Sequence, residues 1–211
     1  MGITERKVKQ RLELRKMILE ASMKLFVEEG FEKVSMRKIA EIIEYSPTTL
    51  YLYFKDKNEI LYELCEMGFQ KMTEYNKDLG QIKNPLLRLH QMGENYLRFG
   101  LAYPEYYDLM FIQAAPMEVL RRQNCSEWDS ADANINALKE LIRECMEEGV
   151  IVKDDVNAAA IGVWAMVHGL VSLSIRNRLG KMLDGGNEAA AMEKSLHFLL
   201  NAIDQTVRHS K

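Results

Sequence analysis

A short segment near residue 50 concentrates hydroxyl groups that can hydrogen-bond to DNA phosphates and to the edges of bases. Its hydroxyl-bearing residues are Ser46, Thr48, Thr49, Tyr51 and Tyr53. Ser46 followed by Pro47 is typical of a helix start, because serine caps free backbone N–H groups and proline lacks one. Leu50 and Phe54 would then form the buried face of this helix. A short helix that is held from behind and is polar in front is typical of a recognition helix in the DNA major groove.

Another short helix must precede this segment and hold it in place. Ser35 predicts a helix that starts at Met36, with the serine hydroxyl accepting from free backbone N–H groups. Residues 44–45 would make the turn into the next helix. The buried stripe of the first helix would consist of Ile39, Ala40 and Ile43. Together the two segments predict a helix-turn-helix.

Residues 18–61 resemble the DNA-binding domain of the TetR/AcrR family of bacterial transcriptional repressors. The likeness is carried, at matched spacing, by Ile18, Ala21, Leu25-Phe26, Gly30-Phe31, Ser35-Met36-Arg37-Lys38-Ile39-Ala40, Ser46-Pro47-Thr48-Thr49-Leu50-Tyr51 and Tyr53-Phe54-Lys55-Asp56-Lys57-Asn58-Glu59. The chain departs from the usual pattern at Lys38, Ile43-Glu44-Tyr45, Leu52 and Tyr53. These departures bear on the operator sequence more than on the DNA-binding class.

The resemblance implies a set of DNA contacts made by both backbone and side-chain groups. The Ser35 hydroxyl and the Met36 backbone N–H would bind a phosphate at a helix N-terminus. Thr48 and Thr49 would meet base edges, and Arg37 a phosphate or a base. For any single residue, ordinary surface or core is the alternative. The full set is Ser35, Met36, Arg37, Ser46, Pro47, Thr48, Thr49, Tyr51, Tyr53 and Lys57.

The N-terminal sixteen residues carry six basic and two acidic side chains, although the whole chain has a net charge of -3. A basic terminus is often only a solvated tail. Placed directly before a helix-turn-helix, it is better interpreted as a phosphate-binding arm that leads into the first helix.

The rest of the chain predicts an all-α protein. Its 211 residues are 47% hydrophobic, contain four prolines and lack strand-like runs of alternating β-branched residues. We expect about nine helices in two domains. Residues 1–56 would form the DNA-binding domain and residues 57–211 a ligand-binding and dimerisation domain. The expected helices cover residues 8–29, 36–43, 47–54, 56–79, 85–101, 104–113, 129–148, 154–179 and 187 onward, with a loop or irregular helix over 114–126.

A further resemblance, to the WHG-type C-terminal domain of some TetR regulators, covers residues 96–111 and 164–170. It implies a small-molecule site, and aromatic and methionine side chains suit an apolar pocket. The alternative is that they simply fill the core. The candidates are Met92, Tyr96, Phe99, Tyr103, Tyr107, Met110, Phe111, Trp128, Trp164 and His168.

Residues 156–175 contain no formally charged side chain and are long enough to cross a bilayer. Polar residues and small residues dilute their hydrophobicity, so we expect no membrane span but a helix buried in the core or at a subunit interface. The resemblance implies a homodimer formed through the last two helices. A twofold dimer would present two recognition helices to successive major grooves of an approximate palindrome.

Other classes of protein find little support in the sequence. Histidine spacing gives no HExxH or ExxH metal motif, and neither a phosphate-binding glycine loop nor a GxSxG elbow occurs. We therefore expect no enzyme, no metal and no cofactor. Three scattered cysteines and a polar N-terminus without an apolar stretch predict a cytoplasmic protein. The prediction is a ligand-responsive repressor, released from DNA by a small hydrophobic effector; the alternative is a helical protein-binding module.

Overall fold

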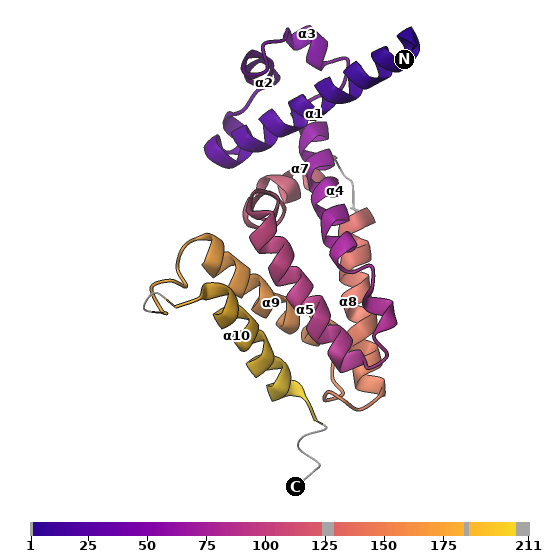
Figure 1. The fold of residues 1–211 in the computed structure, drawn as a ribbon, viewed down its shortest axis with the longest axis vertical. Coiled ribbons are helices and arrows are strands. Elements are labelled where there is room, and N and C mark those ends of the chain that lie inside the picture. The colour runs from indigo at the N-terminus through magenta and orange to yellow at the C-terminus, as the bar shows by residue number, and fades with distance from the viewer. Residues whose placement is uncertain (1, 124–128, 184–185, 206–211) are drawn as a thin grey trace. The chain divides into compact units, whose positions relative to one another are not determined.

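The computed structural model describes residues 2–123, 129–183 and 186–205, and within them the fold is all-α (Figure 1). These residues form ten α-helices and no strand; Ile151 and Asp204 make an isolated bridge. The helices are α1 (Ile3–Glu29), α2 (Met36–Ile42), α3 (Pro47–Leu50), α4 (Lys57–Tyr75), α5 (Pro85–Ala102), α6 (Pro104–Tyr107), α7 (Ala115–Gln123), α8 (Asp129–Glu147), α9 (Val156–Ile175) and α10 (Glu188–Ile203). The predicted all-α class is confirmed.

Several element boundaries differ from the prediction. Helix α1 begins at Ile3 rather than at residue 8, and α4 ends at Tyr75 rather than near residue 79. Residues 114–126, expected to be a loop or irregular helix, contain α7. The helix expected over residues 104–113 consists of α6 followed by a π-helix, Asp108–Ile112. The start of α4 is as predicted, because the Asp56 carboxylate accepts from the Asn58 and Glu59 backbone N–H groups at 2.8 and 3.0 Å.

The chain divides into two compact units that do not follow a single cut in the sequence. The first comprises residues 1–68 and 105–128, and the second comprises residues 69–104 and 129–211. Helix α4 passes from the first unit into the second. The predicted boundary between residues 56 and 57 divides the chain by expected function, DNA binding against ligand binding and dimerisation, and not by compact units. This division by function stays a prediction.

The first unit is built around the helix-turn-helix. Helix α1 packs on α2, and α2 packs on α3. Their shared core is apolar and fully enclosed, so the four-residue α3 does not depend on its own weak helical propensity. The enclosed side chains, each at most 1% exposed, are Ile18, Phe26, Ile39, Ala40, Leu50 and Phe54.

The second unit is organised around α5, which packs against α8, α9 and α10. Helix α5 carries an apolar face, and two glycines let neighbouring helices come close to its backbone. A Cβ atom at Gly100 would lie 2.3 Å from a Val171 methyl on α9, and one at Gly93 would lie 3.0 Å from a Leu196 methyl on α10. Close α5–α9 and α5–α10 contact therefore depends on these glycines.

Replacing Gly100 by alanine should destabilise the second unit by about 1–3 kcal/mol, because the Val171 side chain is fully buried and cannot move aside. Urea unfolding followed by circular dichroism measures this loss. Gly80→Ala is the matched control, since nothing lies within 4 Å of a Cβ atom there. Equal midpoints for the two variants would contradict the expected overpacking.

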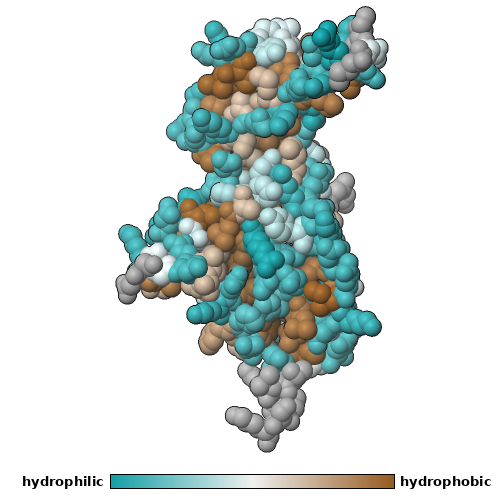
Figure 2. Space-filling model, in the orientation of Figure 1, coloured by the Kyte–Doolittle hydropathy of each residue, from teal (hydrophilic) through white to brown (hydrophobic). Residues whose placement is uncertain are grey.

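Helix α9 is apolar without being buried in the chain. It has the length and composition of a membrane span, yet only 17% of its most apolar 18-residue window is buried. Ile161 is 63% exposed on α9, and Phe198 is 72% exposed on α10. Figure 2 shows apolar surface on the second unit. The prediction that α9 is buried in the core is thus wrong for a single chain, and burial at a subunit interface remains the expectation.

Candidate nucleic-acid interface and effector region

The N-terminus of α2 has the geometry expected of a phosphate contact. The Ser35 hydroxyl accepts from the Lys38 backbone N–H at 3.2 Å, which confirms the predicted cap. The Met36 side chain is buried, so only its backbone N–H is left to meet an anion. Arg37, one residue further, is exposed.

The turn between α2 and α3 contains a non-glycine residue in the left-handed region. Glu44 has φ 59°, and beyond it the Tyr45 backbone N–H donates to the Ala40 carbonyl at 2.9 Å. A residue with a Cβ atom is strained at this φ, whereas glycine is not. Glu44 therefore carries a local cost to stability.

Replacing Glu44 by glycine should raise the free energy of unfolding by about 1 kcal/mol, because glycine adopts a positive φ without the steric cost. Glu41→Gly is the matched control. It also removes an exposed acidic residue, but from within α2, and should lower stability by about 1 kcal/mol. Chemical denaturation of both variants measures the two shifts. Shifts of the same sign would contradict the assignment of strain to Glu44.

Helix α3 is capped and braced as predicted, but it ends at Leu50 rather than at residue 54. The Ser46 hydroxyl oxygen accepts from the Thr49 backbone N–H at 3.1 Å and lies 2.9 Å from the Thr49 hydroxyl. Pro47 occupies the first turn, and Leu50 is completely buried behind it. Thr49 is thus partly committed to the cap, whereas Thr48 is exposed.

The tyrosines of this segment differ in their surroundings. Tyr51 is 56% exposed directly after α3. Tyr53 is half-buried, and the Arg11 guanidinium of α1 lies over its ring at 5.9 Å. Among the expected DNA contacts on and after α3, Thr48 and Tyr51 therefore present the most accessible side chains.

Lys57 is held by the protein itself. Its ammonium donates to the Phe31 carbonyl at 2.8 Å and lies 4.2 Å from the centre of the Phe31 ring. It also approaches the Glu32 carboxylate at 4.0 Å. A phosphate contact by Lys57 stays a prediction, and it would require the ammonium to share or leave these partners.

The expected effector residues fall into two groups. Those in the first unit are Tyr107, Met110 and Phe111, and those in the second unit are Met92, Tyr96, Phe99, Tyr103, Trp164 and His168. Trp128 lies outside the described residues. Tyr107 and Phe99 are completely buried. This burial favours the alternative that these two side chains fill the core rather than line a pocket.

Within the second unit, α5 and α9 bring three of the candidates together. The Trp164 indole N–H donates to the Tyr96 hydroxyl at 3.1 Å, and the same hydroxyl lies 3.4 Å from His168 Nδ1. Burial lowers the pKa of His168, so its imidazole is neutral at neutral pH. The arrangement places polar atoms on an otherwise apolar stretch of α9.

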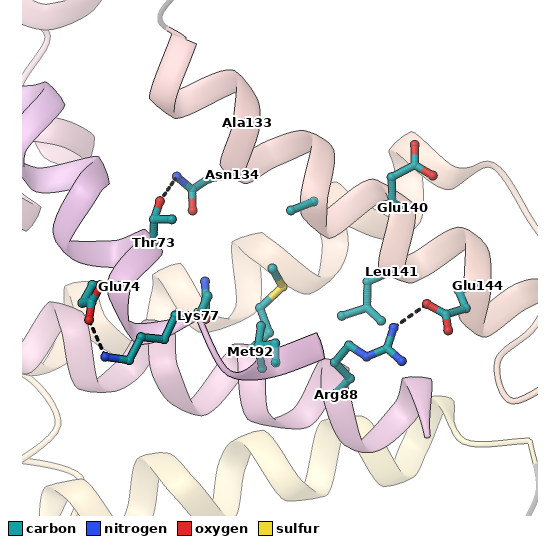
Figure 3. A pocket seen from close by; sticks show the side chains of 13 residues that line it. Thr73, Glu74, Lys77, Arg88, Met92, Ala133, Asn134, Glu140, Leu141 and Glu144 are labelled. Carbon is teal, nitrogen blue, oxygen red and sulfur yellow. Dashed lines mark hydrogen bonds and ion pairs between the residues drawn. The ribbon is translucent and has the colours of Figure 1, made fainter. Parts of the chain in front are cut away.

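A cavity of about 430 Å³ opens between α4, α5 and α8 within the second unit (Figure 3). Charged pairs lie at its wall: Arg88 contacts Glu144 at 2.6 Å and Lys77 contacts Glu74 at 2.5 Å. Of the expected effector residues that the structure describes, only Met92 lines it. The other lining residues are mostly polar, so a search for aromatic and methionine side chains could not find them. They are Thr73, Glu74, Asn76, Lys77, Leu79, Arg88, Ala133, Asn134, Ala137, Glu140, Leu141 and Glu144.

The two described cysteines are buried and unreactive as thiols. Burial raises the pKa of Cys65 far above its ordinary value, and it raises the pKa of Cys145 to about 11. Burial and the raised pKa both disfavour the thiolate, which is the form of cysteine that acts as a nucleophile.

Comparison with known proteins agrees with these features. Residues 18–64 match the model for bacterial regulatory proteins of the tetR family, and residues 89–199, a little over half of the chain, match the tetracyclin repressor-like C-terminal domain. An HTH-type transcriptional regulator of Staphylococcus aureus is 29% identical over 126 residues, which covers 49% of this chain and 68% of that protein. One from Haemophilus influenzae is 32% identical over 88 residues, covering 41% of this chain and 47% of that protein.

Solved structures show the same fold at low sequence identity. The regulator PfmR from Thermus thermophilus has a TM-score of 0.65 and 20% identity, over 87% of this chain and 97% of that one. FadR from Bacillus subtilis, solved with stearoyl-CoA, has a TM-score of 0.67 and 20% identity, over 88% and 96%. The capped helix-turn-helix, the helical second unit and the two family matches lead to one conclusion: the chain belongs to the tetR family of DNA-binding transcriptional regulators, and it is not an enzyme.

Proposed function

We propose that the chain is a cytoplasmic homodimeric repressor that leaves a palindromic operator when a small hydrophobic effector binds its second unit. The observation that carries the DNA-binding part is the presentation of α3. Leu50 and Phe54 anchor it from behind, while Thr48 and Tyr51 remain accessible in front. Such a helix can enter a major groove without rearranging its own core.

The proposed dimer uses α9 and α10. Their exposed apolar side chains leave a surface that a monomer would expose to water, and exposed patches of this kind mark interaction sites. Exposed side chains on these helices include Ile161, Trp164, Leu173 and Phe198. Pairing with a second copy would bury them and fix the spacing of two recognition helices.

The effector would bind in the second unit, either in the cavity between α4, α5 and α8 or beside the Tyr96–Trp164–His168 group. An effector shifts the regulator only if it binds the DNA-bound and free states unequally. Helix α4, which continues from the first unit into the second, would carry the change. Stearoyl-CoA, named for the Bacillus subtilis neighbour, is the first compound to test.

Fluorescence anisotropy with DNA from upstream of the protein's own gene tests the proposal. We expect tighter binding to that duplex than to a random duplex of equal length. We also expect a steep loss of affinity with salt, because phosphate contacts release counterions. Absence of any preference at moderate salt would refute the proposed operator specificity. Adding an effector found by thermal-shift screening should then release the duplex.

A further inference from the structure

Three side chains with metal-binding chemistry converge between α5 and α10 in the second unit. His90 and Glu94 lie one helical turn apart on α5, and His197 comes from α10. One candidate donor atom from each lies within 4.8 Å of the other two. Two imidazoles and a carboxylate are ligands that Zn²⁺ and related divalent ions accept. We refer to His90, Glu94 and His197 as the α5–α10 cluster.

The packing of the two helices holds this cluster together. Gly93, beside Glu94, lets the Leu196 side chain of α10 approach the α5 backbone, and Leu196 is almost completely buried. His197 follows directly, and its ring centre lies 4.1 Å from that of His90. The contact between the two helices therefore brings the two histidines together.

Hydrogen bonding leaves His90 unsatisfied. Its Nε2 atom is buried and has no hydrogen-bond partner among the described residues. Its Nδ1 atom lies 3.6 Å from a Glu94 carboxylate oxygen, which is longer than a hydrogen bond. The imidazole thus has a ring nitrogen that no described residue uses, and imidazole nitrogens are common metal ligands.

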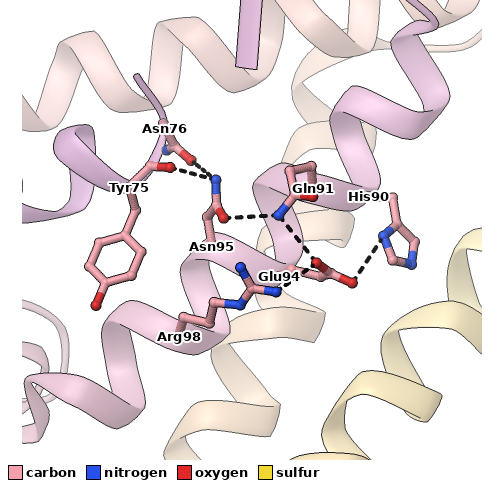
Figure 4. A network of polar contacts seen from close by, with 7 residues as sticks. All are labelled: Tyr75, Asn76, His90, Gln91, Glu94, Asn95 and Arg98. Carbon is pink, nitrogen blue, oxygen red and sulfur yellow. Dashed lines mark hydrogen bonds and ion pairs between the residues drawn. The ribbon is translucent and has the colours of Figure 1, made fainter. Parts of the chain in front are cut away.

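Glu94 is positioned by neighbours on its own helix (Figure 4). One carboxylate oxygen accepts from the Gln91 side-chain amide and from the Arg98 guanidinium, each at 3.2 Å. The other oxygen is the one directed toward His90. Outer partners of this kind orient metal-binding carboxylates and histidines in known sites.

We propose that His90, Glu94 and His197 bind one divalent transition-metal ion of the Zn²⁺ class, which joins α5 to α10. Three protein ligands leave a fourth position for water in a tetrahedral site. Zinc–ligand distances near 2.0–2.1 Å place donors about 3.3 Å apart, so the cluster must close by less than about 2 Å. The exposed His197 side chain can supply that movement. This site is separate from the hydrophobic effector proposed above.

Titration of the untagged, chelator-treated full chain with zinc tests the proposal. We expect one zinc ion per chain and a higher melting temperature, since the ion would bind only the folded arrangement of α5 and α10. Cobalt in place of zinc should give visible d–d absorption without a thiolate charge-transfer band. His197→Gln should weaken zinc affinity by at least about tenfold, and so should Glu94→Gln. Glu193→Gln, which removes an exposed carboxylate of α10 outside the cluster, should leave the affinity unchanged.

The proposal is overturned if the chain binds no zinc, if His197→Gln and Glu94→Gln bind it as tightly as the unaltered chain, or if thiolate bands show that cysteine holds the metal. His197 is exposed, so its variant should keep its helicity, which circular dichroism checks. A chain that prefers its operator but binds no zinc would refute the metal site and leave the proposed function standing.

Discussion

Replacing Thr48 and Tyr51 together by alanine should lower operator affinity by about 10- to 100-fold while leaving the fold intact. Both side chains are exposed, so their loss removes no packing from the first unit. A threonine contact to a base edge and a tyrosine contact to a phosphate would account for a loss of this size. Anisotropy titrations on operator DNA measure it, and thermal unfolding should show little change.

Tyr62→Ala is the matched control for this experiment. Tyr62 is an exposed tyrosine of the first unit, but it lies on α4 and outside the helix-turn-helix. Its removal should leave operator affinity within about twofold of the unaltered chain. Thr49 is a poorer target than Thr48, because its hydroxyl and backbone N–H belong to the Ser46 cap. Unchanged operator binding by the double variant would support the alternative of a protein-binding helical module.

A charge on the exposed apolar surface of α9 should separate the subunits. Ile161→Glu is expected to give a monomer, because pairing would bury an unpaired carboxylate. A monomer holds a single recognition helix, so operator affinity should fall by at least about a hundredfold. Sedimentation equilibrium measures the association, and anisotropy measures the loss on DNA.

Leu87→Glu is the matched control, since Leu87 is 61% exposed but lies on α5. This variant should remain dimeric and keep its operator affinity. If Ile161→Glu stayed dimeric, the proposed interface through α9 and α10 would be wrong, whatever happened on DNA.

Local sequence signals predicted the helix-turn-helix well, because its capping interactions span only a few residues. Ser35, Ser46 and Pro47 fix the two helix starts through contacts at most three residues apart. Leu50 and Phe54 then follow the helical period into the core. Short-range chemistry of this kind is fully visible in the sequence.

Features that depend on contacts between distant segments could not be predicted in the same way. The apolar pattern of α9 suited either a core or an interface, and only the packing of α5, α8 and α10 shows how little of it one chain buries. The effector candidates were chosen by residue type, but the chain distributes them over two units. The cavity between α4, α5 and α8 uses mostly polar residues that no aromatic pattern would select.

The α5–α10 cluster also depends on a contact between distant segments, which the sequence does not predict. His90 and Glu94 are four residues apart, a spacing that a search for HExxH or ExxH does not include. Their third partner, His197, is more than a hundred residues away and meets them only because Gly93 admits Leu196. Sequence reasoning therefore predicted no metal, while the fold offers a candidate site.

The two buried thiols can report local unfolding of each unit separately. Cys65 belongs to the first unit and Cys145 to the second, and both are shielded in the folded chain. An alkylating reagent can modify them only when the surrounding helices open locally. The modification rate at each cysteine therefore measures how often its unit opens. With Cys125 replaced by serine, mass spectrometry would read both rates from the same sample. Operator DNA should slow alkylation at Cys65 more than at Cys145, and an effector should do the reverse.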